Sequence, residues 1–337
     1  MKNVTLVSLV WCSVLFVPGC QQIFGLGPTK LVEDAGSNPE GSSPEGNDCD
    51  TGLGLIAFQS SRDGNAEIYI MNEDGSDPRN LTNNEASDTR PTISPDGTQV
   101  AFFSDRDNQE HELYLVPVSG GPAVPLTRED RSWMGGSGGA DWISNERILL
   151  SHRTSSGTFD LYTFDRGGAG LEDFVVRQQA DSDVKVNEDR SKIYQIVHTP
   201  FNAYTAEVYW RDADGSNLER LTFDANGTSD VGRCNSVTPV ITEDEEEQFV
   251  AARGVAANRF QLILFDHDGG EIDLSQNAFH EMSPDTAYGV RGEIVFESNR
   301  PDGGAIRNVW WMKIDGSAAR QLTTVGGTRA DWWRPRP

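Results

Sequence analysis

Basic residues are scarce in this chain of 337 residues, because 28 lysines and arginines stand against 52 aspartates and glutamates and give a formal net charge of −24. A surface of this sign repels nucleic-acid phosphates and anionic lipid headgroups. We therefore expect no nucleic-acid partner. Solubility outside the cytoplasm explains the charge, and cationic or calcium-bridged partners are the alternative interpretation.

The sequence also lacks the motifs of common enzymes and cofactor-binding proteins. It has no phosphate-binding glycine loop and no dinucleotide fingerprint in a βαβ context. Gly135–Gly139 matches the nucleophile-elbow pattern around Ser137, but that motif requires a following helix and none is expected. Asp212–Gly215 is similar to a calcium loop, yet Trp210 stands where an EF-hand needs an acid. We therefore expect no catalytic residue, no bound metal and no cofactor.

Histidine is rare and dispersed. The five copies lie on different repeats without metal-ligand spacing: His111, His152, His198, His267 and His280. His152 follows an apolar strand and could face a central channel, but a structural histidine is the simpler interpretation. The dispersion argues against a histidine-based active site.

A hydrophobic run long enough to cross a bilayer comfortably is missing too. Lys2 precedes a short apolar stretch, Val4–Val17, which has the length of a signal-peptide core. The stretch ends in Val17-Pro18-Gly19-Cys20, which resembles a bacterial lipobox. The resemblance implies a lipoprotein signal peptide over residues 1–19 and acyl chains on Cys20. Gln21 follows where aspartate would favour the inner membrane, so we expect the outer membrane; an ordinary signal peptide with an incidental cysteine is the alternative.

Residues 20–52 are expected to be a lipidated N-terminus and flexible linker. Gly36–Asn47 is rich in glycine, serine and proline and has no apolar periodicity, so it cannot bury enough surface to fold. A flexible coil of about 30 residues has a reach on the order of 30 Å.

Only four cysteines are present. Cys12 lies in the expected signal peptide and Cys20 is the expected lipid site, which leaves Cys49 and Cys234. Two cysteines exported to an oxidising compartment could form a disulfide. Two free thiols are an equally compatible outcome.

A tetrapeptide built around Ile-Tyr occurs in six copies, which begin 45–54 residues apart. The copies start at Glu67, Glu112, Asp160, Glu207, Gln261 and Asn308. Each follows an apolar run and a polar turn, and most precede an Asp-Gly hairpin turn and a closing Leu-Thr or a near relative. Such a period, built from short β segments, is typical of four-stranded propeller blades. The sequence therefore predicts an all-β, six-bladed β-propeller over residues 53–337.

The ends of the chain are predicted to meet in the first blade. An innermost strand precedes each apolar run, with its clearest copy at Arg90–Gly97, but the repeat near Leu55 has none. The segment Arg329–Pro335 aligns with the sequence around Asp141-Trp142 and supplies the missing strand. Closure by this strand leaves no long unpaired sheet edge. In blade three, Phe174–Val176 is predicted to replace the missing Leu-Thr.

The repeats resemble a known family. Ser-Pro-Asp-Gly at Ser94–Gly97, Ser-Arg-Asp-Gly at Ser61–Gly64, and the Asp-Gly turn before Leu-Thr are similar to repeats of the TolB-like propeller family. The resemblance covers roughly residues 53–337 and implies six blades. Related repeats occur on serine peptidases and oligogalacturonate lyases, so the resemblance specifies fold better than function. TolB itself carries an additional N-terminal α/β domain, whereas here the propeller follows a linker.

Arginines after the second strand of five blades are the candidate binding residues. Their equivalent positions predict that they share one end of the ring with nearby aspartates: Arg62, Asp63, Arg106, Asp107, Arg153, Arg253 and Arg300. Guanidinium groups there could bind carboxylates of a protein or an acidic glycan. The alternative is that they form salt bridges between blades.

Two classes of function remain. The first is a monomeric, lipid-anchored, non-enzymatic platform that binds a protein or glycan at the cell envelope. The second is a polysaccharide-active lyase or hydrolase of the related propeller type, with histidines and arginines at the channel mouth. The dispersed histidines and the absence of a nucleophile favour the first.

The lipid anchor gives the first prediction. Cys20→Ala removes the expected acylation site, so the variant should leave the membrane fraction and incorporate no labelled palmitate. Cys12→Ala changes a cysteine within the expected signal peptide and should behave like the wild type. Membrane-bound Cys20→Ala together with an unlabelled wild type would contradict the anchor.

Overall fold

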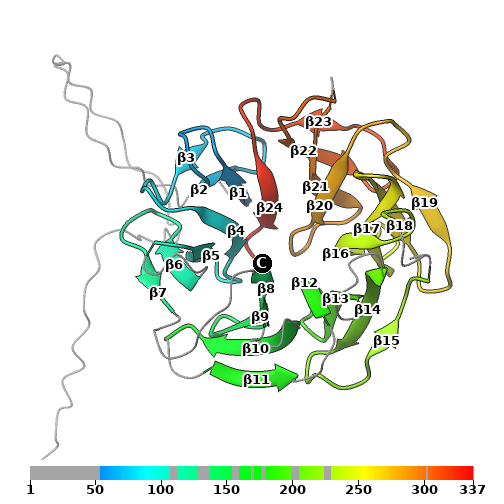
Figure 1. Cartoon of the computed structure of the whole chain (residues 1–337), viewed down its shortest axis with the longest axis horizontal. Helices are drawn as coiled ribbons and strands as arrows, with labels where there is room; N and C mark the ends of the chain where they lie inside the picture. Colours follow the sequence, from blue (N-terminus) through cyan, green and yellow to red (C-terminus); the bar gives the residue numbers. More distant parts are fainter. Residues whose placement is uncertain are drawn as a thin grey trace, which may run out of the picture. The chain divides into compact units, whose positions relative to one another are not determined.

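Within the described residues, 24 strands form six antiparallel sheets of four strands each. The computed structural model describes residues 54–106, 112–126, 137–153, 159–167, 171–175, 180–198, 205–223, 229–300 and 303–336, all within the compact unit Gly46–Pro337. The sheets are arranged as blades around a common axis (Figure 1). The predicted six-bladed β-propeller is therefore confirmed. None of the described segments forms a helix with the length and hydropathy needed to span a membrane.

The strands of each blade are given from the innermost outward. Blade 1 contains β24 (Thr328–Trp333), β1 (Leu55–Ser60), β2 (Glu67–Asn72) and β3 (Arg79–Asn80). Blade 2 contains β4 (Asp88–Ile93), β5 (Gln99–Ser104), β6 (Glu112–Pro117) and β7 (Val124–Pro125). Blade 3 contains β8 (Ser137–Trp142), β9 (Arg147–Arg153), β10 (Phe159–Asp165) and β11 (Leu171–Val175).

The second half of the ring repeats this order. Blade 4 contains β12 (Ala180–Val186), β13 (Lys192–His198), β14 (Glu207–Asp212) and β15 (Glu219–Arg220). Blade 5 contains β16 (Cys234–Ile241), β17 (Glu247–Ala256), β18 (Arg259–Phe265) and β19 (Glu271–Asp273). Blade 6 contains β20 (Glu281–Asp285), β21 (Glu293–Ser298), β22 (Asn308–Lys313) and β23 (Arg320–Gln321).

Blade 1 combines strands from both ends of the described chain. The C-terminal strand β24 pairs antiparallel with β1, with Leu55 opposite Trp333, and Figure 1 shows the two strands side by side. Trp332 is only 4% exposed, and the Trp333 indole donates a hydrogen bond to the Pro95 carbonyl of blade 2 at 3.1 Å. The turn beside it needs Gly97, because its φ is 68° and a Cβ there would lie 2.2 Å from the Trp333 ring. The last strand therefore joins blade 1 to its neighbour.

The repeated Glu-Ile-Tyr and Leu-Thr motifs hold the outer parts of blades 1 and 4 together. The Thr82 hydroxyl donates to the buried Glu67 carboxylate and accepts the backbone N–H of Ile68 at 3.0 Å. Thr222 donates to Glu207 in the same way. The threonine, which follows the outermost strand, thus bonds to the start of the third strand. This shared bond explains why both motifs recur together.

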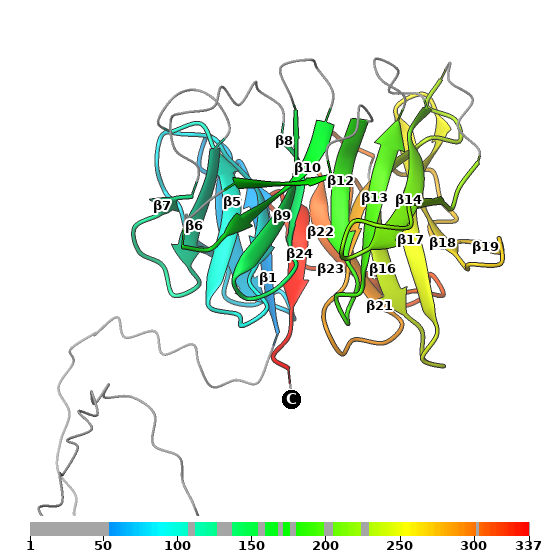
Figure 2. The same ribbon diagram turned by 90° about the horizontal axis from the view of Figure 1, so that it is seen from below.

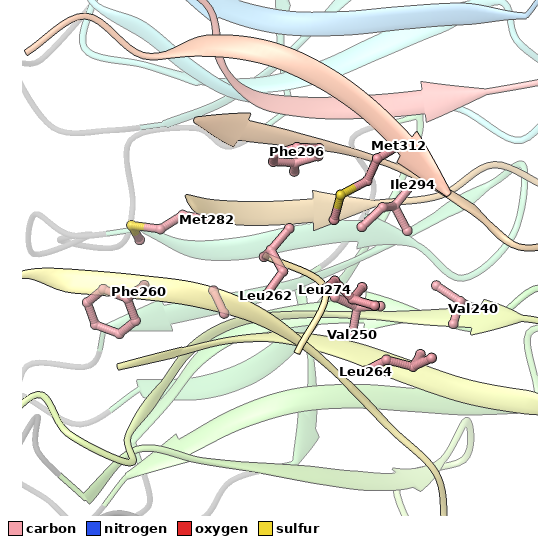
Figure 3. Close-up of a cluster of buried hydrophobic side chains, with 11 residues drawn as sticks. Val240, Val250, Phe260, Leu262, Leu264, Leu274, Met282, Ile294, Phe296 and Met312 are labelled. Carbon is pink, nitrogen blue, oxygen red and sulfur yellow. The ribbon is translucent and has the colours of Figure 1, made fainter. Parts of the chain in front are cut away.

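Apolar side chains pack between blades rather than at the axis. Six clusters of buried residues each join two neighbouring sheets. Figure 3 shows the cluster between blades 5 and 6, which contains Val240, Val250, Ala252, Phe260, Leu262, Leu264, Leu274, Met282, Ile294, Phe296 and Met312. The centre of the ring is consequently left to the polar side chains of the innermost strands.

Two blades depart from the common repeat. In blade 3, the outermost strand β11 contains Phe174 and pairs with β10, with Leu161 opposite Val175. Val176 lies outside the described residues, so the replacement of Leu-Thr by Phe174–Val176 stays a prediction. In blade 4, the innermost strand Ala180–Val186 has no counterpart in the sequence prediction. Its sequence lacks the proline or tryptophan that marks the other copies.

Candidate functional site

The predicted arginines Arg62, Arg106 and Arg300 occupy equivalent places directly after the second strands of blades 1, 2 and 6. The first two donate from Nε to the last serine of that strand, at 3.0 and 2.9 Å. Each guanidinium also lies over two aromatic rings of its own blade; for Arg62, the ring centres of Phe58 and Tyr69 are 5.3 and 4.4 Å away. These arginines are therefore held by contacts within their blades.

The hydrogen-bond acceptors of these arginines do not form the inter-blade salt bridges that we considered. Arg106 pairs with Asp88 at 2.8 Å, and Arg300 pairs with Glu281 at 2.5 Å, in both cases on the innermost strand of the same blade. Arg62 donates to the Gly326 carbonyl just before β24. The described ion pairs of this set are thus bonds within a blade, which corrects that alternative. A contribution of these arginines to binding stays a prediction.

The other candidates are less uniform. Arg253 lies inside β17 rather than after it, because this strand extends to Ala256, and it pairs with Glu271 at 2.8 Å. Arg153 is the last residue of β9, and its side chain, like the whole of Asp107, lies outside the described part. The prediction that Arg253 occupies a position equivalent to the other arginines, after the second strand of its blade, is therefore wrong.

Asp63 takes part in a hydrogen-bonded group on the outer part of blade 1. Its carboxylate accepts hydrogen bonds from the Tyr69 hydroxyl and from Asn80, the latter at 3.2 Å. The bond from Tyr69 lowers the pKa of Asp63. Burial, helped by that carboxylate, raises the pKa of Tyr69 to about 12. At neutral pH, Asp63 therefore stays the hydrogen-bond acceptor and Tyr69 the donor.

The predicted cysteine sites are only partly described. Cys234 is buried at the start of β16, and its sulfur lies 3.8 Å from the Thr222 hydroxyl oxygen. Cys49 and Cys20 lie outside the described residues. The disulfide and the lipid site therefore stay predictions.

Histidines do not gather into a site within the described part. His280 Nδ1 lies 2.9 Å from the Asn258 carbonyl, and burial lowers the pKa of His280. His267 Nε2 lies 3.3 Å from the Tyr194 hydroxyl on another blade. No group of three potential metal-ligating side chains converges among the described residues.

The axis of the ring carries a cluster that the sequence analysis did not single out. One residue of each innermost strand pairs with the middle of the adjacent apolar run: Asp331, Thr92, Asp141, Lys185, Thr238 and Asp285. We call these six the axial ring. The Lys185 ammonium lies 2.7 Å from Asp285 and 2.9 Å from Asp331, so blade 4 is joined across the axis to blades 6 and 1.

The axial carboxylates also bond neighbouring blades through the backbone. Asp331, Asp141 and Asp285 each accept the N–H of the residue that follows the axial position in the next blade, at 2.7–2.8 Å. Such charge-assisted bonds to backbone donors are stronger than neutral ones. The cluster is therefore a framework that fixes the blades relative to one another.

Burial makes the ionisation of this cluster unusual. Burial raises the pKa of Asp285 to about 7, although Lys185 opposes the shift, and burial also raises the pKa of Asp141. Burial disfavours the charge on Lys185, but Asp285 and Asp331 outweigh it and hold its pKa well above the usual value. Three carboxylates around one ammonium carry excess negative charge, so a carboxylate retains its proton to nearly neutral pH.

Beyond the axial ring, toward the C-terminal end of β24, the channel widens into a cavity of about 100 Å³. Figure 2 shows the C-terminus leaving the ring at this end. We call this cavity, lined among others by Arg190, Tyr288, Trp333 and Arg336, the channel mouth. The exposed Arg336 guanidinium lies 4.5 Å from the centre of the half-buried Tyr288 ring. Burial lowers the pKa of Arg190, with Asp141 opposing and Arg336 adding to the shift.

Part of the axial ring could be predicted from the sequence. The similarity between Ala140-Asp141-Trp142 and Ala330-Asp331-Trp332 predicted equivalent strands, and both aspartates belong to the axial ring. It gave no sign that Lys185, on a strand of different sequence, would meet Asp331. Aspartate at this position in three innermost strands was the observation that could have indicated a polar axis.

Comparisons with known proteins support the same fold. Residues 43–174 match the sequence profile of the family described as "TolB beta propeller domain". A TolB homolog of Chlorobaculum tepidum is 29% identical over 113 residues, which are 34% of this chain and 25% of the relative. A Tol-Pal system protein TolB of Desulfosudis oleivorans is 26% identical over 113 residues, covering 34% and 24%. A tricorn protease homolog of Streptomyces coelicolor is 37% identical over 73 residues, covering 22% and only 6%.

The chain thus spans a quarter or less of the length of these relatives. Among solved structures, TolB from Acinetobacter baumannii superposes with a TM-score of 0.65 at 16% identity, over 85% of this chain and 69% of that one. At this identity the likeness concerns the fold. The arrangement of sheets defines a six-bladed β-propeller. Its repeats are similar to those of the TolB beta propeller domain.

The axial cluster generates a prediction of pH dependence. The pKa of Asp285 is about 7 in the folded protein, above its ordinary value of 3.8, so the folded state binds more protons between these pH values. The free energy of unfolding should therefore fall as pH rises through this range, by an amount on the order of a few kcal/mol. Asp285→Asn keeps an oxygen that can accept the Trp332 N–H but removes the titration. Its fall in stability between about pH 5 and pH 8, measured by urea unfolding, should be smaller than that of the wild type.

Asp315→Asn is the matched control. Asp315 lies in an exposed turn, where a hydrogen bond from Ser317 lowers its pKa, so its contribution to stability is lost only as the pH falls below the tested range. An Asp285→Asn variant with the same pH dependence as the wild type would contradict the account.

Proposed function

We propose that this protein is a lipid-anchored, non-enzymatic binding platform of the cell envelope, and that its partner is a protein. The anchor is inferred from the lipobox-like motif at Cys20 and the apolar stretch before it. Residues 20–52 would connect the anchor to the propeller. The names of two relatives, a TolB homolog and a Tol-Pal system protein, support an envelope role.

The composition of the channel mouth is the observation that carries the proposal. A concave surface there combines three aromatic residues, Tyr288, Trp332 and Trp333, with the arginines Arg190, Arg334 and Arg336. Tyrosine, tryptophan and arginine contribute most to binding energy in protein interfaces, above all when they lie in central pockets. A guanidinium stacked on an aromatic ring presents a preorganised surface, which lowers the entropic cost of binding.

The chemistry of the axis fits binding better than catalysis. The Lys185 ammonium is occupied by two carboxylates, and Asp141, Asp285 and Asp331 each accept a backbone N–H. A general acid, base or nucleophile must be within reach of a substrate atom. These groups instead bond one another and the blades, so their role is to hold the framework that supports the mouth.

The proposal predicts the effect of substitutions at the mouth. The partner is first identified by crosslinking from native membranes, and its affinity for the full chain is then measured. Tyr288→Ala and Arg336→Ala should each weaken binding by about tenfold or more, as expected for central interface residues. Both side chains are at least partly exposed, so the melting temperature should change little.

Arg320→Ala is the control for these variants. The Arg320 guanidinium also stacks on an aromatic ring, that of Trp311 at 5.0 Å, but it lies on the outermost strand of blade 6. It should bind the partner as the wild type does. Unchanged binding by both mouth variants, or an equal loss in Arg320→Ala, would show that the partner does not use the channel mouth.

A further inference from the structure

A second, smaller cavity lies on the other side of the axial ring, toward the start of the innermost strands. Its volume is about 50 Å³, and Lys185 lines both cavities. Each blade contributes to it the residue two positions before its axial-ring member: Arg329, Arg90, Gly139, Asp183, Ser236 and Ser283. We call these six residues the upper ring.

The backbone at this level is specialised to turn side chains toward the axis. The pairing of every innermost strand with its neighbour shifts register here, which is the signature of a β-bulge. Arg90, Ser283 and Arg329 have left-handed φ values of 55°, 49° and 52°. Non-glycine residues adopt this conformation rarely, and bulges often redirect side chains beside functional sites.

Two donors on the wall of this cavity have no hydrogen-bond partner among the described residues. Ser283 is 8% exposed, and its hydroxyl makes no hydrogen bond, although its backbone N–H donates to Ser236 Oγ at 3.0 Å. The Arg329 backbone donates to Glu297 at 3.2 Å, and the Arg329 charge opposes the rise that burial causes in the pKa of Asp183, but the Arg329 guanidinium makes no hydrogen bond within the described part of the chain. A buried polar group without a partner is costly, so an unfilled donor in a cavity points to a ligand.

The charge of the upper ring fits an anion. Arg329 and Arg90 supply two positive charges against the single carboxylate of Asp183. Burial lowers the pKa of Arg90 to about 10, and the like charge of Arg329 adds to the shift, whereas Asp183 and Glu297 oppose it. Glu297, the other acid nearby, is already paired with Arg307 at 2.5 Å. A net positive cavity is unusual in a chain of net charge −24.

We infer that the upper ring binds a carboxylate and that Arg329, Arg90 and the Ser283 hydroxyl donate hydrogen bonds to it. This carboxylate belongs to an acidic side chain of a peptide. A water molecule occupies about 10–15 Å³ by this measure of cavity volume, so there is room for a few atoms the size of water. A carboxylate with its methylene fits this space, whereas a sugar ring does not. The slim side chain of glutamate can reach into such a cavity from the end of the channel. The inference goes beyond the proposed function, because it concerns the opposite side of the axial ring from the channel mouth.

The inference is tested by ligand-induced stabilisation of the full chain. Sodium acetate, titrated at constant ionic strength and constant pH near neutrality, should raise the melting temperature progressively, because binding to the folded state alone stabilises it. Neutral acetamide, which has the same shape, should not. Arg329→Gln should weaken the acetate response by about tenfold or more in concentration, because it removes a charge-assisted donor.

Ser283→Ala separates binding from folding. The wild-type hydroxyl has no partner, so its removal should leave the melting temperature without acetate unchanged or slightly higher. The same variant should nevertheless respond less to acetate. Lys313→Gln, which makes the same change in net charge as Arg329→Gln on the third strand of blade 6, should respond as the wild type does.

The source of the carboxylate is tested with two larger probes. N-acetylglutamate α-amide, a peptide-like carboxylate, should stabilise the protein at lower concentrations than glucuronate, a sugar acid. A stronger effect of glucuronate would overturn the assignment to a peptide. Equal acetate responses of the wild type, Arg329→Gln and Ser283→Ala, or equal effects of acetate and acetamide, would overturn the site itself. Because no partner protein is used, these outcomes are independent of the test of the channel mouth.

Discussion

Hydrogen bonds between the innermost strands of neighbouring blades are the constraint on which the rest of the structure depends. The carboxylates of Asp331, Asp141 and Asp285 accept backbone N–H groups of the next blade, and Lys185 joins three blades across the axis. Burial of apolar surface between blades supplies most of the stabilisation, but it has no preferred direction. The axial bonds do have one, because each joins a fixed side-chain atom to a fixed backbone atom. They therefore set how the sheets are oriented around the axis.

The bonding of the axial groups determines where a partner can bind. The polar groups of the axial ring are occupied by one another, so the middle of the channel is a rigid framework rather than a reactive site. Side chains with capacity left for a ligand lie on either side of it. At the channel mouth these are the stacked Tyr288 and Arg336, and at the upper ring they are Arg329 and Ser283. A rigid framework with different chemistry at its two ends suits a protein whose role is to hold partners.

Much of the fold could be predicted from the sequence because the information is local and repeated. The spacing of the Ile-Tyr segments predicts the number of blades, and the C-terminal copy around Asp331 predicts the strand that completes the first one. The channel could not be predicted in the same way. Whether Lys185 reaches Asp331, 146 residues away, depends on the register of strands in different blades. The roles of Arg62 and Arg106 were also hidden, because their acceptors and aromatic partners come from strands on both sides of the loop.

The account is tested most directly by hydrogen exchange at the three amides that cross between blades, those of Ile93, Val186 and Trp332. If the axial bonds hold the ring together as one unit, these amides exchange only when the whole propeller unfolds. Their free energies of exchange then equal the global free energy of unfolding and fall with denaturant at the same slope. Exchange of these amides through local opening, fast and insensitive to denaturant, would contradict the account, because the blades would then separate at the axis without unfolding.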